Sequence, residues 1–280
     1  MAIQLSQVQV ARAQSIGSVF SARSLRLEKE RSSPVMVADD FRVTGRPFGP
    51  HPHAGFSAIS YIFEDSTGKL RNRDSLGHEL IIGPGGVCWL QAGSGGMHEE
   101  IPAENGKELH GLQVFVNLSA KNKFTPPKAM WLEPQKVPEW RSGAGDRVRV
   151  AVGSFGGVVS PLEPIEPFDL LDVELKHELT FSLKSGRNAV VFAQKGELVV
   201  RSGSEKRNVG AGQGLVMSGE GEAAFATTGG ARFMLLSGVE TKEPVVMQGP
   251  FIMNVRGEIQ AAYQRFEAGL MGHLEPYEGN

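Results

Sequence analysis

The sequence predicts an all-β protein made of two small β-barrels in tandem, followed by one C-terminal helix. Short apolar runs alternate throughout with Gly, Pro, Asn, Asp and Ser, the residues that favour turns. The 35 glycines and 16 prolines among 280 residues make about 18% of the chain, against an average of roughly 12%, and they follow no collagen-like period. Helical periodicity over eleven residues or more is scarce, so short strands joined by tight turns dominate the prediction.

Ten segments have the length and composition of strands, and their regular short spacing is typical of a sandwich or barrel. They are Ala58–Phe63, Glu79–Ile82, Val87–Gln91, Leu112–Asn117, Val148–Val152, Leu170–Leu175, Ala189–Ala193, Glu197–Arg201, Gly214–Met217 and Arg232–Ser237.

The segment from Ser119 to Asp146 predicts a crossing between two domains. It is weak in strand pattern and contains several prolines and a Ser-Gly-Ala-Gly run at 142–145. We place the boundary near 142, which gives domains 1–142 and 143–280. The strand, turn, strand and glycine-rich turn ending at 83–87 recur in the second half up to 210–215, a layout that indicates an internal duplication.

One segment follows helical rather than strand periodicity. Between Glu258 and Leu270, apolar residues recur at i, i+3, i+4, i+7 and i+11, which places them on one face of a helix: Ile259, Ala262, Tyr263, Phe266 and Leu270. We expect a helix over 258–270 that packs back on the barrels as a structural clasp.

Charge and cysteine content exclude several classes of protein. The formal net charge is -2 and no basic run exceeds two residues, so direct nucleic-acid binding is not expected. Cys88 is the single cysteine, which excludes an intramolecular disulfide and a paired-cysteine zinc site and fits a reducing compartment. The N-terminus does not resemble a signal peptide, and no run of about 18 apolar residues predicts a membrane span. These features predict a soluble, cytoplasmic protein, for which a monomer is the default expectation.

Two short motifs in the first half point to a metal site. His51-Pro-His53 directly precedes a predicted strand, and His98-Glu-Glu100 follows a glycine-rich turn. In extended backbone residues i and i+2 point to the same face, so each motif presents a pair of side chains. If the two strands face each other inside a barrel, His51, His53, His98 and Glu100 converge as metal ligands.

Three imidazoles and one carboxylate suit Fe, Mn, Ni, Cu or Zn, and the carboxylate favours iron, manganese or nickel. A His-x-His pair alone also occurs by chance in turns; the second motif, some forty residues later, is what favours the metal interpretation. Alternation points Glu99 away from the site, as a solvated group or one just behind the ligands, and His110 could also lie behind them.

The expected pocket around the ion is apolar, with Phe56, Met97, Phe115 and Trp89 as candidate walls. The second half carries Ser182-Leu-Lys184 where the duplication would place the histidine pair, so its barrel is predicted to be metal-free. The chain contains no Walker-type loop, no dinucleotide fingerprint and no Gly-x-Ser-x-Gly elbow, which disfavours nucleotide-dependent and serine-hydrolase chemistry.

Around these motifs the sequence resembles the pirin family of bicupins. The resembling segments are His51-Pro-His-Ala-Gly-Phe56, Arg73-Asp-Ser-Leu-Gly77, Gly83-Pro-Gly85, Trp89-Leu-Gln-Ala-Gly93, Met97-His-Glu-Glu-Ile-Pro102, His110-Gly-Leu-Gln113 and Gly249-Pro-Phe-Ile-Met-Asn254. The resemblance is dense from about 50 to 117 and reaches 254, while the middle of the second half shares the layout only.

The resemblance implies two tandem cupin barrels of the jelly-roll type, with one mononuclear iron in the N-terminal barrel held by His51, His53, His98 and Glu100. Family members include enzymes with quercetin 2,3-dioxygenase activity and, in animals, a nuclear iron-dependent co-regulator of transcription factors. Two positions depart from the family pattern, since Ala54 replaces an arginine and Ser57 replaces an acidic residue that many members carry. Any substrate or partner contact that the family arginine makes is therefore not expected at Ala54.

Two functions of different classes follow. In the first, the protein is a dioxygenase that binds a flavonol or related enol and dioxygen at Fe(II), with Mn, Ni, Cu or Zn as other candidates, and Glu100 acts as the general base. In the second, it is an iron-dependent redox sensor that binds and regulates a partner protein.

Overall fold

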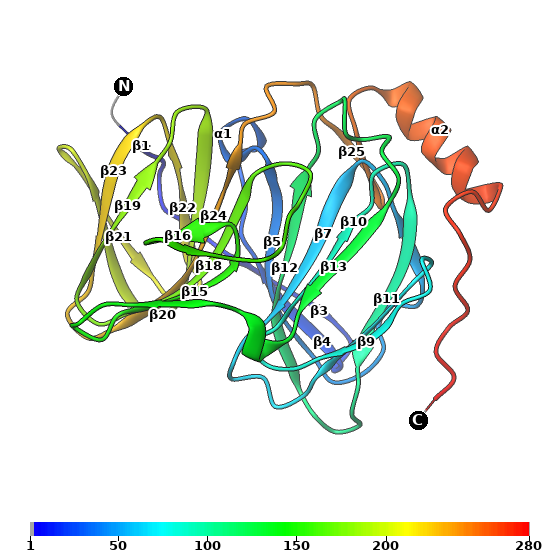
Figure 1. The fold of residues 1–280 in the computed structure, drawn as a ribbon, viewed down its shortest axis with the longest axis horizontal. Coiled ribbons are helices and arrows are strands. Elements are labelled where there is room, and N and C mark those ends of the chain that lie inside the picture. The colour runs from blue at the N-terminus through cyan, green and yellow to red at the C-terminus, as the bar shows by residue number, and fades with distance from the viewer. Residues whose placement is uncertain (1–2, 280) are drawn as a thin grey trace. The chain divides into compact units, whose positions relative to one another are not determined.

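The computed structural model describes residues 3–279, and β-strands dominate it (Figure 1). The predicted all-β class with a C-terminal helix is confirmed. Each of the ten predicted strands overlaps a strand of the structure, although 189–193 and 197–201 are parts of one strand, β20 (Arg187–Ser202). A register shift between Ala193 and Lys195 marks an irregularity where β20 pairs with β24 (Ala231–Val239).

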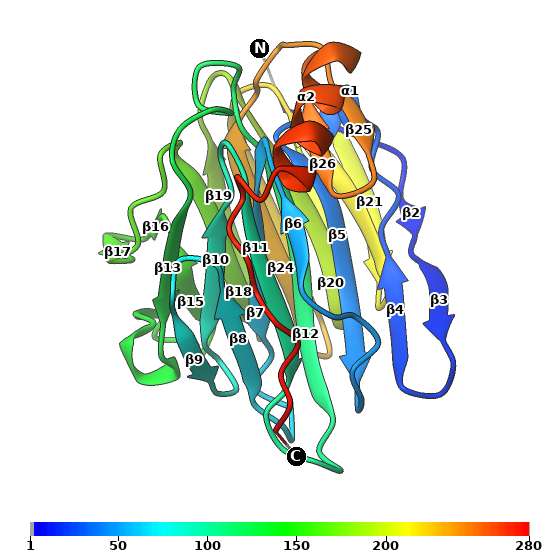
Figure 2. The same cartoon turned by 90° about the vertical axis from the view of Figure 1, so that its right-hand side faces the viewer.

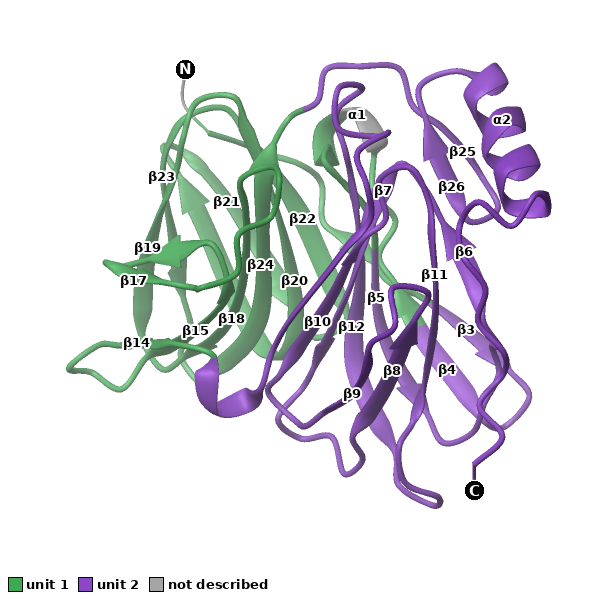
Figure 3. Cartoon of the chain, turned by 45° about the vertical axis from the view of Figure 1, so that its right-hand side comes forward, with its two compact units in different colours: residues 1–12, 23–37, 137–240 green, residues 13–22, 38–136, 241–280 purple. Residues whose placement is uncertain are grey.

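Internal contacts divide the chain into two compact units, coloured separately in Figure 3. Unit 1 comprises residues 1–12, 23–37 and 137–240, and unit 2 comprises 13–22, 38–136 and 241–280. This grouping differs from the contiguous division at 142 because the terminal segments join the opposite half. Near the N-terminus, β1 (Gln4–Leu5) pairs with β22 (Gln213–Ser218), and the C-terminal residues pack within unit 2.

Unit 2 contains a four-stranded sheet and most of a seven-stranded sheet. The larger sheet has the order β13-β10-β7-β12-β5-β4-β3, the last three of which lie side by side in Figure 2. The smaller sheet has the order β6-β11-β8-β9. The bounds are β3 Arg12–Ile16, β4 Phe20–Ser24, β5 Val35–Val43, β6 His51–His53, β7 Phe56–Ile62, β8 Leu70–Asp74, β9 Glu79–Ile82, β10 Val87–Gln91, β11 Gly96–Pro102, β12 Leu109–Asn117 and β13 Lys128–Leu132.

Unit 1 is built around an eleven-stranded sheet with a large apolar core. Phe181, Leu183 and Phe225 belong to this core, so the inward positions beside Ser182 are filled by apolar side chains. Its other strands are β2 Gln9–Val10, β14 Glu139–Arg141, β15 Arg147–Val152, β18 Phe168–Leu175, β19 Glu178–Leu183, β21 Glu205–Gly210 and β23 Gly221–Ala226.

The remaining elements of the described chain are two small hairpins and three helical segments. They are β16 Ser154–Phe155 with β17 Val158–Val159, β25 Val246–Gln248 with β26 Phe251–Met253, α1 Lys29–Ser32, the 3₁₀ turn η1 Pro134–Lys136 and α2 Arg256–Glu267. Within residues 3–279, no helix has both the length and the apolar character that spanning a membrane requires.

The C-terminal helix α2 begins two residues before the predicted 258–270 helix and ends three residues before its predicted end. At its start, Glu258 Oε2 accepts the backbone N–H of Asn254 at 2.9 Å and of Val255 at 3.2 Å, which satisfies groups that a helix start leaves unpaired. Ile259 and Ala262 are buried, but Leu270 is 61% exposed and lies beyond the last turn. The apolar face is therefore narrower than the sequence periodicity predicted.

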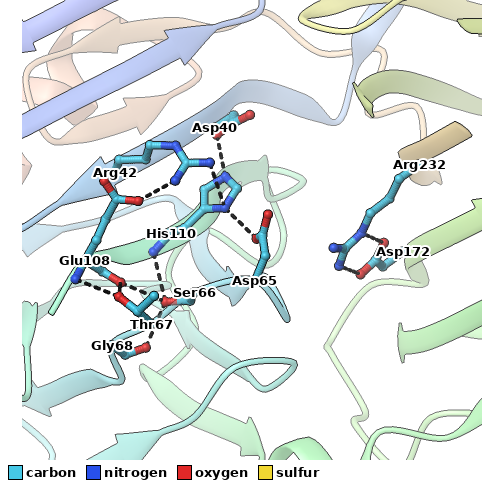
Figure 4. Close-up of polar contacts among 10 residues, drawn as sticks. All are labelled: Asp40, Arg42, Asp65, Ser66, Thr67, Gly68, Glu108, His110, Asp172 and Arg232. Carbon is cyan, nitrogen blue, oxygen red and sulfur yellow. Dashed lines mark hydrogen bonds and ion pairs between the residues drawn. The ribbon is translucent and has the colours of Figure 1, made fainter. Parts of the chain in front are cut away.

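Arg232 and Asp172 form an ion pair in unit 1 whose contribution to stability can be tested. Arg232 Nε and Nη2 donate to the two oxygens of Asp172 at 2.9 and 2.5 Å, and the Asp172 side chain is 2% exposed (Figure 4). We expect Arg232→Lys to lower the free energy of unfolding by about 1–2 kcal/mol, because an ammonium cannot reproduce two parallel bonds to one carboxylate. Urea unfolding measures the change. The exposed Arg201→Lys serves as the control, and equal effects of the two substitutions would contradict the prediction.

Candidate metal centre

The three predicted histidine ligands lie on two paired strands at the edge of the four-stranded sheet. Among the described residues, 3–279, β6 pairs as a strand only with β11, so Pro52 in its middle needs no second hydrogen-bonding neighbour. In the antiparallel register His51 lies opposite His98, and His53 lies opposite Gly96. The cross-strand pairing therefore brings together motifs that are some forty residues apart in sequence.

The imidazoles of His51, His53 and His98 form a compact triangle. Their ring centroids are 4.8, 4.7 and 4.7 Å apart, and one nitrogen from each ring lies within 4.8 Å of the others. The Nε2 atoms of His51 and His98 are 3.2 Å apart. Two nitrogens bound to one ion at about 2.1 Å are separated by about 3.0–3.4 Å in octahedral or tetrahedral geometry, so this spacing fits a shared metal ion.

Backbone carbonyls orient two of these rings. His51 Nδ1 lies 2.9 Å from the carbonyl oxygen of Gly49, and His53 Nδ1 lies 3.4 Å from that of Pro250. A carbonyl can only accept, so each Nδ1 carries the proton and each Nε2 presents its lone pair to the cluster. Such a hydrogen bond on the far nitrogen fixes the tautomer that a metal-binding histidine requires.

Burial keeps these histidines neutral, which is the form that binds metal. Burial, and then the neighbouring His51, lowers the pKa of His53 to about 3. The pKa of His98 lies well below its usual value because of burial, and then because of His53 and His51. The pKa of His51 is lowered by burial, against a smaller opposing effect of the Gly49 carbonyl. At neutral pH no proton has to leave these rings before an ion binds.

Glu100 lines the same pocket but stands outside the triangle. Its Oε2 accepts the hydroxyl of Ser60 at 2.8 Å, and burial raises the pKa of its carboxyl to about 7 although the Ser60 hydrogen bond opposes the rise. The structure thus brings the three histidines together as one group, with the fourth predicted residue beside them and bonded to a serine.

The pocket at these residues has a volume of about 370 Å³ and is mainly apolar apart from the histidines, with four phenylalanines among the residues that line it. Of the four predicted walls, Phe115 lines it, and Phe56 lies behind His53 and Phe115 with ring centroids 5.0 and 4.6 Å away. The predictions for Met97 and Trp89 were wrong. Met97 alternates to the opposite face from His98 and packs against α2 residues, while Trp89 is 2% exposed within the seven-stranded sheet.

Other pocket residues were missed in the sequence. They come mainly from the hairpin strand β4, from β5 and from the loop after it: Phe20, Asp39, Phe41, Val43, Pro47 and Phe48. The i, i+2, i+4 spacing of Asp39, Phe41 and Val43 is a strand pattern that could have placed them on one face.

Glu99 is buried rather than solvated. It points away from the triangle as predicted, but it is 3% exposed, and Arg73 Nη1 lies 3.0 Å from its Oε2. The backbone N–H of Tyr277 also donates to this oxygen at 3.1 Å, so the C-terminal tail contacts the strand that carries His98 and Glu100.

His110 belongs to a separate polar cluster. Its Nε2 lies 3.0 Å from Asp40 Oδ1 and its Nδ1 lies 2.7 Å from Asp65 Oδ1, with Arg42 and Glu108 paired beside it (Figure 4). On β12 it alternates with Leu109, which lines the metal pocket, so His110 faces the other side of the strand. The prediction that it lies behind the ligands is not supported, because its partners are these aspartates.

Comparison with protein-family models identifies both halves of the chain. Residues 7–116 match the model described as Pirin, and residues 170–272 match the Pirin C-terminal cupin domain. Together the matches span well over half of the sequence, including all four predicted ligands.

Individual relatives point to the same family as these models. A Pseudomonas aeruginosa protein named "Putative quercetin 2,3-dioxygenase PA3240" is 32% identical over 86% of this chain and 88% of its own. The crystal structure of a quercetin 2,3-dioxygenase from Acinetobacter baumannii superposes with a TM-score of 0.86 at 24% identity, covering 98% of this chain and 100% of that one. The bacterial pirin YhhW from Escherichia coli, solved in complex with nickel(II), has a TM-score of 0.66 at 17% identity, with coverage of 85% and 99%.

Proposed function

The chain belongs to the pirin family, and from this we propose that it is a metal-dependent dioxygenase of the quercetin 2,3-dioxygenase type, acting on a flavonol or related enol. The observation that carries the proposal is the convergence of three neutral imidazoles beside Glu100 in a pocket that phenylalanines help to line. A relative that is 32% identical bears the name of this activity, and so does a solved structure of the same fold.

In this proposal His51, His53, His98 and Glu100 hold the ion. An ion held there supplies Lewis acidity toward an enol hydroxyl and the redox chemistry that dioxygen needs. Iron is proposed because of the family resemblance. A nitrogen-rich donor set with one carboxylate also accepts manganese, nickel, copper or zinc, and one structural relative holds nickel.

The chain's own residues bind the substrate and take its proton. Phe41, Phe48 and Phe115 offer faces and edges against which a planar aromatic ring can pack, and they exclude water from it. The Glu100 carboxylate lines the same pocket, where it can accept the proton of an acidic enol hydroxyl. Holding ring and carboxylate together in one pocket supplies the orientation that the reaction requires.

A partner-regulating role has less support in this chain. Ala54 occupies the position of the family arginine, and it is 0% exposed, packed with Phe251 and Met97. This position therefore presents no side chain to a partner protein.

Metal analysis tests the site first. We expect protein purified at low oxygen without chelator, or supplied with Fe(II) anaerobically, to hold one metal ion per chain, and we expect His53→Ala and Glu100→Ala to reduce that content. The exposed His177→Ala, in unit 1, is the matched control and should retain the metal. Absence of stoichiometric metal in the parent protein would overturn the proposal.

Turnover tests the reaction. The loaded protein should consume dioxygen and bleach the flavonol absorbance of quercetin, and His53→Ala should do neither. Full metal occupancy without turnover of quercetin or related enols would contradict the dioxygenase assignment and leave a metal-binding protein.

A further inference from the structure

Ser60 forms a link between the two sheets of unit 2 directly behind Glu100. It lies on β7 in the seven-stranded sheet and is 1% exposed, whereas Glu100 lies on β11 in the four-stranded sheet. The Ser60 Oγ is 2.8 Å from Glu100 Oε2 and 3.0 Å from Gln113 Oε1.

Gln113 places a second hydrogen-bond acceptor beside the Ser60 hydroxyl. It lies opposite Ser60 in the β7–β12 register, and its Nε2 donates to the backbone carbonyl of Ile59 at 3.1 Å. That bond fixes the amide orientation, so the oxygen of Gln113 faces Ser60. The single hydroxyl proton of Ser60 can serve only one of the two acceptors at a time, and the carboxylate is the stronger acceptor.

The bond to Ser60 also limits how Glu100 can reach the histidines. The donor atoms that lie within 4.8 Å of one another come from His51, His53 and His98, while the Glu100 carboxylate is held by Ser60 at Oε2. The other oxygen, Oε1, is the one left to face an ion. A carboxylate that is held on one side loses less freedom when its other oxygen binds.

We propose that Ser60 is a positioning residue that presents Glu100 to the three-histidine cluster as a one-oxygen ligand. The inference rests on the proposed function, since it takes Glu100 as a ligand of the ion. It adds a residue outside the ligand motifs, and one that no metal-ligand spacing in the sequence would identify.

Co²⁺ binding to the full chain tests the proposal without reference to turnover. The affinity is measured by competition with a chelator, and the visible absorption of bound Co²⁺ reports its coordination. We expect Ser60→Ala to weaken binding about 10–100-fold and to change the absorption spectrum, whereas Ser60→Thr, which keeps the hydroxyl, stays within about threefold of the parent. Ser57→Ala is the matched control, because Ser57 is equally buried on β7 but lies three residues away, on the opposite face.

A double substitution separates an effect through Glu100 from a general effect on folding. In a Glu100→Gln background, adding Ser60→Ala should change the Co²⁺ affinity less than twofold, because the carboxylate that Ser60 positions is already absent. An undiminished effect in that background would overturn the proposal, and so would parent-like binding by Ser60→Ala. Weaker binding by Glu100→Gln together with parent-like binding by Ser60→Ala would leave the proposed function standing, whereas no Co²⁺ binding by the parent chain would overturn both.

Discussion

Replacing Lys123 with methionine should lower the free energy of unfolding by about 3–5 kcal/mol. Lys123 is 0% exposed, and its Nζ donates to the backbone carbonyls of Gly55 at 2.8 Å and Ile252 at 3.0 Å and to Asn117 Oδ1 at 2.5 Å. Methionine preserves the length and apolar stem of the side chain but removes the donors. Each buried oxygen left without a donor costs about 1–3 kcal/mol.

The three acceptors explain why this lysine has a large effect. Gly55 follows His53 in a left-handed turn at φ 81°, and a Cβ there would lie 1.9 Å from the oxygen of Ile252. The ammonium thus joins the Asn117 side chain to two backbone segments, at Gly55 and Ile252, that approach too closely to admit a side chain at position 55. Lys123→Met removes the ammonium donor but leaves the three acceptor oxygens buried. Replacing a whole buried polar network by apolar groups can be neutral or stabilising, but that case does not apply here.

Chemical unfolding in urea measures the effect, with Lys121→Met as the control. Lys121 is exposed and lies two residues earlier in the same loop, so its substitution should change stability by less than about 0.5 kcal/mol. A loss below about 1 kcal/mol for Lys123→Met would show that water or other groups satisfy the three oxygens.

The burial of Lys123 could not be predicted from the sequence. The strands, in contrast, were predictable because a short apolar run between turn residues is a local sequence pattern. The structure places β9 and β10 at the predicted ranges. The segment around Lys123 reads as a polar loop, and its burial depends on distant segments that end beside it. The pocket residue Phe20 was missed for the same reason, since it lies in a hairpin far from the histidine motifs in the sequence.

The metal site, like the fold, was only partly predictable from the sequence. The His-x-His and His-x-Glu spacings predict which side chains share a face, and the register of β6 against β11 brings the three imidazoles together. The spacing does not predict how the Glu100 carboxylate turns, because Ser60 on another sheet sets that. It also cannot show that a tail residue, Tyr277, bonds to Glu99 between two predicted ligands.

Glu100→Gln should stabilise the metal-free protein by about 2–3 kcal/mol at pH 8 and by almost nothing at pH 4.5. The pKa of the Glu100 carboxyl rises from 4.5 to about 7 on folding, chiefly because of burial, so between these values the folded chain holds a proton that the unfolded chain has released. Relative to the unfolded chain, this group therefore contributes stability below pH 4.5 and loses it as the pH rises through 7. Glutamine resembles the protonated carboxyl in shape and carries no charge, so it avoids that loss.

Thermal or urea unfolding with a chelator present, at pH 4.5 and pH 8, checks the prediction, and the difference between the two proteins is the quantity to compare. His53, with its pKa lowered to about 3, destabilises the fold as the pH falls below 6.5, but it does so equally in both proteins and cancels in the difference. A difference that does not depend on pH would contradict the burial of the Glu100 charge. Added metal should reverse the order at pH 8, because an ion that binds the folded parent more tightly adds more to its stability than to that of the variant. The carboxylate would then be a group that destabilises the empty site and that the bound ion requires, which is the pattern expected of a functional residue rather than a structural one.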